Sequence, residues 1–154
     1  MKRDYVKFIT RRCARTCALQ ALYSWLLSKN NVKDIELYIV NIQNIQNFDI
    51  SYFHELYVGI ITYISELDAL MIPYLSRDFK KLDYIEHSVL LIALFELTKC
   101  FDIPYKVVIN EAIELAKIFG AEKSHKFING VLDKVVSKFN YKKNTFKIIR
   151  KIKS

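Results

Sequence analysis

The first residues whose types and spacing suit binding chemistry are arginines and aromatic residues near the start of the chain. Arg12, Thr16 and Tyr23 follow one another at intervals of four and seven residues. An α-helix turns by about 100° per residue, so these intervals are close to whole turns and put the three side chains on one narrow stripe. Guanidinium groups contact phosphates and an exposed ring can stack on an unpaired base, which suits single-stranded RNA. The same pattern also fits a solvated basic helix end with a half-buried tyrosine.

Cysteine and histidine are the residues that could hold a metal ion or attack a substrate. Cys13 and Cys17 are four residues apart, whereas Cys100 and the three histidines are scattered (His54, His87 and His125). A structural zinc site uses four ligands in close sequence pairs, and here there is one loose pair. We therefore predict small buried thiols and no metal ligands. A catalytic Cys–His pair is the alternative, and no local motif supports one.

Motifs for catalysis or cofactor binding do not occur in the sequence. It has no Gly-rich phosphate loop and no G-x-S-x-G, H-E-x-x-H or Walker pattern. Glu111 and Glu114 lie three residues apart with Lys117 nearby, a spacing typical of a solvated helix face with ion pairs. We therefore predict a protein that is not an enzyme and uses no cofactor and no small-molecule substrate.

A second basic and aromatic segment, 122–127, follows Gly120 and begins a new helix. Exposed amides at a helix N-terminus favour anions, and Lys123 and Lys126 add positive charge there. The alternative is that Ser124 is a simple N-cap and that Phe127 belongs entirely to the core. Periodicity does not decide between these interpretations.

The overall composition favours a helical protein with polyanionic partners. Only 3 of the 154 residues are glycine and 2 are proline, too few for the many tight turns of an all-β fold. The formal net charge is +8, with basic residues crowded at both ends, and such an excess attracts nucleic acid or an anionic membrane surface. The three cysteines, the lack of a secretory signal and the shortness of the apolar runs predict a cytoplasmic protein that does not span a membrane.

Apolar periodicity and stop signals predict an all-α fold, a compact bundle of about six or seven helices. Thr10 is a candidate N-cap, Asp83 with Glu86 resembles a capping box, and Pro104 and Gly120 enclose another helix. The helix that begins at Asp83 is apolar nearly all round, so we expect it to be central and buried. The expected helices cover about 10–28, 33–46, 49–72, 83–100, 104–120 and 124–139, with a short one at 74–80.

Two long segments resemble the NusB family of bacterial proteins. Residues 11–25, which begin Arg11-Arg12-Cys13-Ala14-Arg15, resemble the arginine-rich first helix of that family. Residues 102–117 are similar to its most characteristic segment, and the similarity continues through 119–134. The shorter segments 73–77 and 92–97 also match. The resemblance runs in register over about residues 10–136, which makes it far more specific than a short motif.

This resemblance implies two small helical subdomains packed together and a function in transcription antitermination. It implies binding to the boxA element of nascent ribosomal RNA transcripts, in a heterodimer with the small-subunit ribosomal protein NusE. The pair would join an antitermination complex on RNA polymerase with NusA and NusG. We accordingly expect a basic flexible N-terminus at 1–9, a NusB-like helical RNA-binding domain at 10–140 and a basic C-terminal tail at 141–154.

The family's binding residues carry over by position. Arg11, Arg12 and Arg15 correspond to the arginine-rich RNA-binding motif, Tyr23 to a tyrosine near RNA and partner, and Phe127 to an aromatic residue at the boundary of both. With neighbouring basic residues, the predicted RNA-binding set is Lys2, Arg3, Arg11, Arg12, Arg15, Tyr23, Lys123 and Phe127. The predicted partner-binding set is Tyr23, Tyr74, Glu86 and Phe127, in which Glu86 could pair with a basic residue of NusE.

Two positions depart from the family pattern. Lys123 stands where relatives often carry an acidic residue, and this change should strengthen attraction to phosphate. Leu91 stands in the central helix where an arginine is common, so a polar contact is expected to be missing there.

Three alternatives stay open at the level of sequence. A NusB-like domain can precede a methyltransferase domain, but this chain has no Gly-rich cofactor motif. A carrier or interaction module for the ribosomal protein would lack sequence-specific RNA binding, and the retained arginines argue against it. A general basic helical protein would bind DNA or anionic membrane with little preference for a U-rich single strand.

Overall fold

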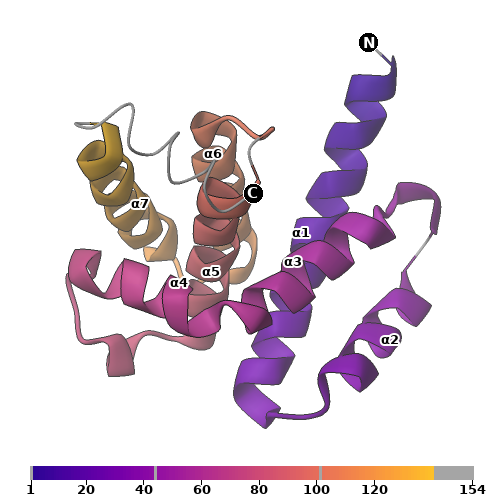
Figure 1. The fold of residues 1–154 in the computed structure, drawn as a ribbon, viewed down its shortest axis with the longest axis horizontal. Coiled ribbons are helices and arrows are strands. Elements are labelled where there is room, and N and C mark those ends of the chain that lie inside the picture. Colours follow the sequence, from indigo (N-terminus) through magenta and orange to yellow (C-terminus); the bar gives the residue numbers. More distant parts are fainter. Residues whose placement is uncertain (1, 44, 101, 141–154) are drawn as a thin grey trace. The chain divides into compact units, whose positions relative to one another are not determined.

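The computed structural model describes residues 2–43, 45–100 and 102–140, and these residues form helices and loops without a strand (Figure 1). The α-helices are α1 (Lys2–Ser28), α2 (Val32–Ile42), α3 (Ile50–Thr62), α4 (Ile64–Met71), α5 (Tyr84–Lys99), α6 (Tyr105–Phe119) and α7 (Ser124–Asn140). Three 3-10 turns join them: η1 (Ile45–Asn47), η2 (Ile72–Tyr74) and η3 (Phe79–Lys81). The predicted all-α class is confirmed, and the predicted tail at 141–154 lies outside the described residues.

The chain divides into two compact units, Met1–Tyr63 and Ile64–Ser154. In the first unit, α1 packs against α2 and α3. The side chains that α1 buries include several alanines, among them Ala14, Ala18 and Ala21. Small side chains let helix axes approach closely, so the larger residues of α3, such as Phe53 and Leu56, can fill the core.

Tyr57 of α3 fastens α2 to this core. Its ring stacks on Phe53 with centroids 5.8 Å apart, and its hydroxyl donates a hydrogen bond to the Val32 carbonyl oxygen at 2.9 Å. Burial, with a smaller contribution from the Glu36 carboxylate, raises the pKa of Tyr57 to about 12. The hydroxyl therefore stays protonated and remains a hydrogen-bond donor at physiological pH.

The first helix begins earlier than the sequence predicts. Thr10 is not an N-cap, because α1 starts at Lys2 and the Thr10 hydroxyl donates back to the carbonyl oxygens of Val6 at 2.9 Å and Lys7 at 3.2 Å. No glycine or proline interrupts residues 2–9, and Asp4 in the first turn interacts favourably with the helix dipole. Residues 2–9 are thus helical in this structure, while their predicted flexibility stays a prediction.

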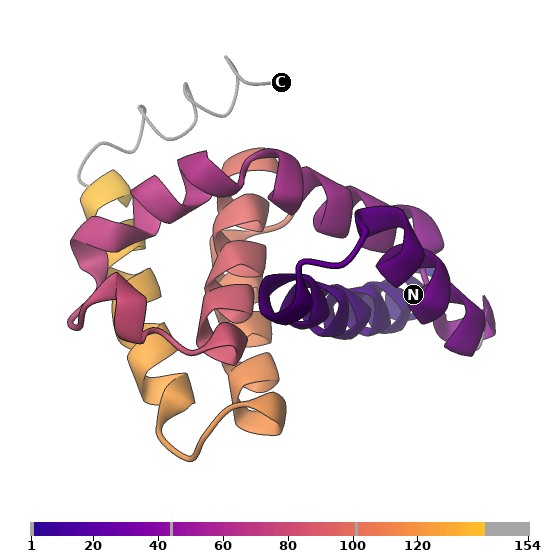
Figure 2. The ribbon, with the colours of Figure 1, turned by 90° about the horizontal axis from the view of Figure 1, so that it is seen from below.

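In the second unit, α5 lies beside α6 and also contacts α4 and α7 (Figure 2). Every residue of α5 from Glu86 to Leu97 is buried, and this confirms the prediction of a central, buried helix. Asp83 accepts a hydrogen bond from the Glu86 backbone N–H at 2.7 Å, as expected for an N-cap. Leu91 is among the fully buried side chains, so an arginine there would need a buried partner.

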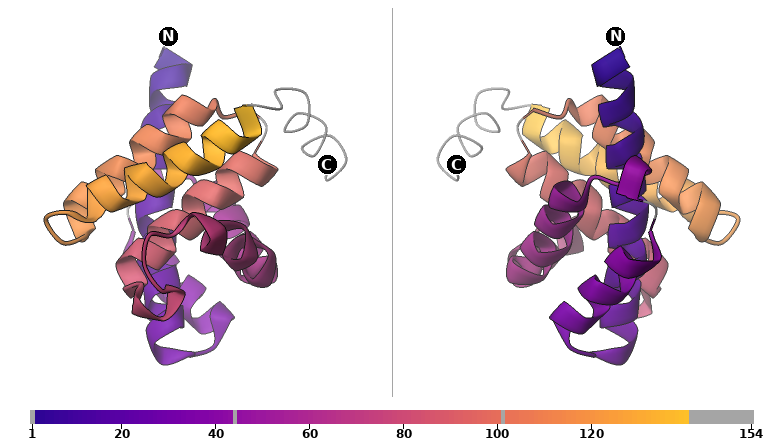
Figure 3. Two further views of the ribbon diagram at one scale, coloured as in Figure 1. Left: turned by 90° about the vertical axis from the view of Figure 1, so that its left-hand side faces the viewer. Right: turned by 90° about the vertical axis from the view of Figure 1, so that its right-hand side faces the viewer.

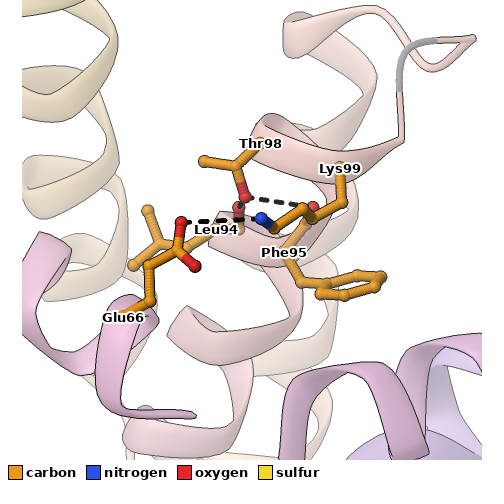
Figure 4. Close-up of polar contacts among 5 residues, drawn as sticks. All are labelled: Glu66, Leu94, Phe95, Thr98 and Lys99. Carbon is orange, nitrogen blue, oxygen red and sulfur yellow. Dashed lines mark hydrogen bonds and ion pairs between the residues drawn. The ribbon is translucent and has the colours of Figure 1, made fainter. Parts of the chain in front are cut away.

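Two polar contacts join α4 to α5 along one side. Near the start of α5, a ring nitrogen of His87 lies 2.7 Å from the Asp68 carboxylate, and Phe79 packs edge-on against the histidine ring. Near its end, Lys99 Nζ lies 3.5 Å from Glu66 Oε1 (Figure 4). The two contacts hold α4 against the start and the end of α5.

Three further predicted helices differ from the observed elements. The helix expected over 33–46 ends at Ile42, where Gln43 is extended, and η1 follows it. The helix expected over 49–72 is broken at Tyr63 into α3 and α4. The helix expected over 74–80 is replaced by η2 and η3 on either side of a loop, because Pro73 occupies the start of η2 and Asp78 caps η3 by accepting a hydrogen bond from the Lys80 N–H.

No single helix of the described residues is long and apolar enough to cross a bilayer. Only together do the segments Ile50–Thr62 and Ile64–Tyr74, which the break at Tyr63 separates, have the required length and apolar composition.

Gly120 ends α6 as predicted, but not through a left-handed conformation. Its φ of −88° and ψ of 174° are extended, and its N–H donates to the Ala116 carbonyl oxygen at 2.9 Å. A Cβ at this position would lie 2.7 Å from that oxygen and 2.8 Å from Ser124 Cβ. Glycine is therefore required by the close approach of the α6 and α7 ends.

We predict opposite effects on stability for alanine at the two glycines of this region. Gly120→Ala should lower the free energy of unfolding by about 1–3 kcal/mol because the added methyl has no space. Gly130→Ala, in α7 with nothing within 4 Å of the added Cβ, should raise it by about 0.5–1 kcal/mol. Urea unfolding followed by far-UV circular dichroism measures both. Equal effects would show that the close approach does not select glycine at 120.

Candidate nucleic-acid interface

The three arginines expected to bind RNA as a group are separated by the turn of α1. Arg12 is exposed, Arg11 is half-buried, and Arg15 is buried, with an exposed fraction of only 3%. Arg11 and Arg15 are one helical turn apart and both stand over the Tyr52 ring of α3, with Cζ 4.6 Å and 5.7 Å from its centroid. A guanidinium above an aromatic face is attracted by the ring quadrupole. Of the three, only Arg12 is exposed.

The predicted stripe on α1 is present in the structure. Arg12 and Tyr23 are exposed, the latter by 38%, and Thr16 between them is half-buried with its hydroxyl bonded to the Arg12 carbonyl oxygen at 3.2 Å. The Arg12 guanidinium lies 5.0 Å from the centroid of the Phe8 ring, one turn earlier. Lys2 and Arg3 are exposed in the first turn of the same helix. Arg12 and Tyr23 thus provide exposed basic and aromatic surface along one face of α1, and Lys2 and Arg3 add exposed charge at its start.

The second unit brings together Glu86, Phe127 and a residue that sequence reasoning did not select, Arg77. Arg77 Nη1 lies 3.0 Å from Glu86 Oε1, and the Arg77 Cζ lies 3.8 Å from the centroid of the Phe127 ring. Glu86 is only 3% exposed, whereas Phe127 is half-buried and the Arg77 side chain is partly exposed. Arg77 therefore links the buried carboxylate to the aromatic residue nearer the surface.

The surroundings of Glu86 oppose its ionisation. Burial, followed by the neighbouring Asp83 carboxylate, raises the pKa of Glu86, although the Ser124 hydroxyl and the Arg77 guanidinium both favour the charged form. Ser124 is itself buried at the start of α7, so this hydrogen bond joins α5 to α7. The predicted pairing of Glu86 with a basic residue of a partner stays a prediction, and in this structure the carboxylate already has Arg77 beside it.

Tyr74 and Lys123 lie elsewhere on the second unit. Tyr74, in η2, is half-buried, and the Lys138 Nζ of α7 lies 5.7 Å from its ring centroid. Lys123 is exposed immediately before α7, where its carbonyl oxygen accepts hydrogen bonds from the N–H groups of Lys126 and Phe127. The predicted residues thus divide between the units: Lys2, Arg3, Arg11, Arg12, Arg15 and Tyr23 lie in the first, and Tyr74, Glu86, Lys123 and Phe127 in the second.

Tyr52 and Arg77 are the two residues that sequence reasoning missed. Both contact residues that the sequence predicts as binding residues: Tyr52 lies under Arg11 and Arg15, and Arg77 joins Glu86 to Phe127. The available signal was weak: Arg77 lies in the short segment 73–77 that resembles the family, and Tyr52 reads as one more apolar position of α3.

The cysteines are placed as small core residues. Cys17 and Cys100 are buried, as predicted, and Cys13 is half-buried with its Sγ 4.0 Å from Gln43 Oε1. Burial, with a contribution from Cys13, raises the pKa of the Cys17 thiol to about 12, which leaves it protonated and a poor nucleophile. Within residues 2–43, 45–100 and 102–140, no group of three or more His, Cys, Asp or Glu side chains is arranged to hold a metal ion.

Comparison with known proteins gives a consistent result. The model of the NusB family matches residues 12–137. A transcription antitermination protein NusB of Blochmanniella floridana is 71% identical over 137 residues, which are 89% of this chain and 99% of that protein.

Solved structures agree in fold with this chain. A crystal structure of the antitermination factors NusB and NusE in complex with dsRNA contains a chain that is 28% identical, with a TM-score of 0.74 over 84% of this chain and 97% of that one. A structure of T. maritima NusB is 32% identical, with a TM-score of 0.72 over 82% and 90% of the two chains.

We predict that the charge of Glu86 makes stability depend on pH. Its raised pKa means that the folded state holds the proton more tightly than the unfolded chain, so its stabilising contribution is complete below the ordinary value of 4.5 and is lost as the pH rises through the raised value. Glutamine keeps an acceptor for Arg77 and Ser124 but carries no charge. The free energy of unfolding of Glu86→Gln, relative to the unsubstituted protein, should therefore increase from about pH 4.5 to about pH 7.

Urea unfolding at a series of pH values tests this expectation. Glu114→Gln is the matched control, because the Glu114 side chain is 48% exposed and pairs only loosely with Lys117 at 3.8 Å. Its difference from the unsubstituted protein should change little with pH. A pH-independent difference for Glu86→Gln would contradict the prediction.

Proposed function

The chain belongs to the NusB family of transcription antitermination proteins, which are not enzymes, and we propose that it acts by binding boxA-type RNA of nascent ribosomal RNA transcripts in a heterodimer with the ribosomal protein NusE. The observation that carries the RNA part of this proposal is the stripe of Arg12, Thr16 and Tyr23 on α1, in which Arg12 and Tyr23 are exposed. The NusB chain of the similar crystal structure is described as bound to NusE and dsRNA, which supports both classes of partner.

We assign different tasks to the residues of the first unit. Arg12 contacts phosphate, and Tyr23 stacks on an unpaired base. Lys2 and Arg3 add long-range attraction, which depends on salt because bound cations are released from the RNA. Arg11, half-buried over the face of the Tyr52 ring, contacts RNA with its exposed part, whereas Arg15 is too deeply buried for direct contact in this structure and positions its neighbours.

The second unit supplies the proposed NusE surface and a further contact to RNA. Tyr74 and Phe127 offer aromatic surface to NusE, as Tyr23 does from the first unit, and aromatic residues are enriched at protein interfaces. Glu86 acts through Arg77, which it holds against the Phe127 ring. Lys123 attracts RNA phosphate beside Phe127.

We further propose a wider setting, which membership of the family supports. The heterodimer joins an antitermination complex on RNA polymerase with NusA and NusG, in the cytoplasm. The activity consists of binding alone and needs no cofactor. RNA and NusE each stabilise the conformation of the protein that the other recognises. Such coupling is reciprocal: if NusE strengthens RNA binding, RNA strengthens NusE binding by the same factor.

Fluorescence anisotropy with a labelled boxA-like RNA and a scrambled RNA, each with and without NusE, tests the proposal at physiological salt. We expect NusE to tighten binding of the boxA-like RNA by about 5–150-fold and to have little effect on the scrambled RNA. A boxA-like duplex is added because the similar crystal structure is described with dsRNA. NusE binding without any RNA preference would support the alternative, a carrier for the ribosomal protein.

The same assay predicts a specific effect of Arg12→Ala. Loss of one phosphate contact should weaken RNA binding about tenfold and reduce the slope of log affinity against log salt by about 1. Lys33→Ala is the matched control, because Lys33 is an exposed cation on α2, outside the stripe. Equal losses for the two variants would indicate general charge attraction in place of a defined surface.

A further inference from the structure

The first turns of α1 precede the part of the chain that matches the family model, which begins at residue 12. They extend the helix past α2 and α3 of the same unit (Figure 3). Residues 2–9 carry three basic residues, Lys2, Arg3 and Lys7, against the single carboxylate Asp4. This segment is therefore a positive, helical extension that precedes the matched residues.

Tyr5 continues the stripe of Arg12, Thr16 and Tyr23. It lies seven residues before Arg12, about two helical turns, so the four side chains share one face of α1. Its exposed fraction is 66%, which is larger than that of Tyr23. Two exposed rings, those of Tyr5 and Tyr23, therefore lie on either side of Arg12 along this face of α1.

Further apolar surface surrounds Tyr5. Val6, Phe8 and Ile9 are all exposed. The Arg12 Cζ lies 5.0 Å from the centroid of the Phe8 ring. Soluble proteins expose adjoining apolar side chains mainly where something binds. The contact with Phe8 also limits the freedom of Arg12, so less entropy is lost when the guanidinium meets a phosphate.

An open groove of about 620 Å³ runs beside Tyr5. Apart from Asp49 at the start of α3, its lining comes entirely from the first turns of α1: Lys2, Arg3, Tyr5, Val6, Lys7 and Thr10. The Asp49 carboxylate accepts a hydrogen bond from the Tyr52 backbone N–H as the N-cap of α3, and its backbone N–H donates to the Thr10 carbonyl oxygen at 3.3 Å. The groove therefore combines apolar walls with three cationic side chains.

We propose that the segment Lys2–Thr10 is an additional binding site for single-stranded RNA that flanks the boxA-type element. A base stacks on Tyr5, and the adjoining phosphates lie along the groove beside Lys2 and Arg3. The proposal rests on the RNA-binding function proposed above. RNA is favoured over an anionic membrane surface because Tyr5 shares the face of α1 that carries Arg12, Thr16 and Tyr23, and a membrane contact is one outcome of the test below.

Anisotropy with two labelled RNAs tests the site in the full chain bound to NusE. One RNA is the boxA-like element alone, and the other carries the same element with U-rich single-stranded flanks. Tyr5→Ala should weaken binding of the flanked RNA about tenfold and leave the unflanked RNA unchanged. Tyr5→Phe should bind as the unsubstituted protein does, because phenylalanine keeps the stacking face.

Tyr38→Ala is the matched control. Tyr38 is 65% exposed in the same unit, but it lies on α2, so its loss should change neither affinity. Circular dichroism verifies that each variant keeps its helix content.

The outcomes separate this inference from the proposed function. If Tyr5→Ala binds the flanked RNA normally while Arg12→Ala does not, the additional site is wrong and the proposed function stands. If the unsubstituted protein prefers neither RNA over a scrambled control, the proposed function fails and the additional site fails with it. If Tyr5→Ala loses binding to phosphatidylglycerol vesicles and not to the flanked RNA, the segment is a membrane contact and the inference is overturned.

Discussion

The first unit depends on one uninterrupted helix that must build a core and present a surface at the same time. Because α1 turns by about 100° per residue, its alanines and leucines face α2 and α3 while another face stays exposed. This constraint separates arginines that are neighbours in sequence. Arg11 and Arg15 rest on Tyr52, and Arg12 points to the surface. A motif that looks uniform in sequence therefore contains arginines that differ in burial and in what they contact.

The second unit uses a buried carboxylate for a similar purpose. Glu86 is unfavourable as an isolated buried charge, and its surroundings raise its pKa despite the nearby Arg77. What the arrangement provides is geometry: Glu86 holds Arg77, Arg77 covers Phe127, and Ser124 ties the same carboxylate to the start of α7. An aromatic side chain held in this way loses little freedom when a partner binds, which favours affinity.

Both units are consistent with a protein that works by binding. The Cys17 thiol is protonated and buried, and the perturbed Glu86 carboxyl is used in a contact within its own unit. A perturbed pKa often marks a catalytic group, but structural networks shift pKa values as well. The exposed side chains of α1 include the cations of Lys2, Arg3 and Arg12 and the ring of Tyr23, and such groups recognise RNA and protein surfaces.

The sequence by itself determined the helical class, the buried α5, the cap at Asp83, the stop at Gly120 and the stripe on α1, because these depend on the spacing of apolar and capping residues along one segment. It placed the start of α1 wrongly, since Thr10 has the type of an N-cap but sits within a run that can stay helical. Only the tertiary structure decided that Tyr52 lies under two arginines and that Arg77 joins Glu86 to Phe127. Such contacts join residues from different elements, and periodicity within one element carries no information about which neighbour its side chains will meet.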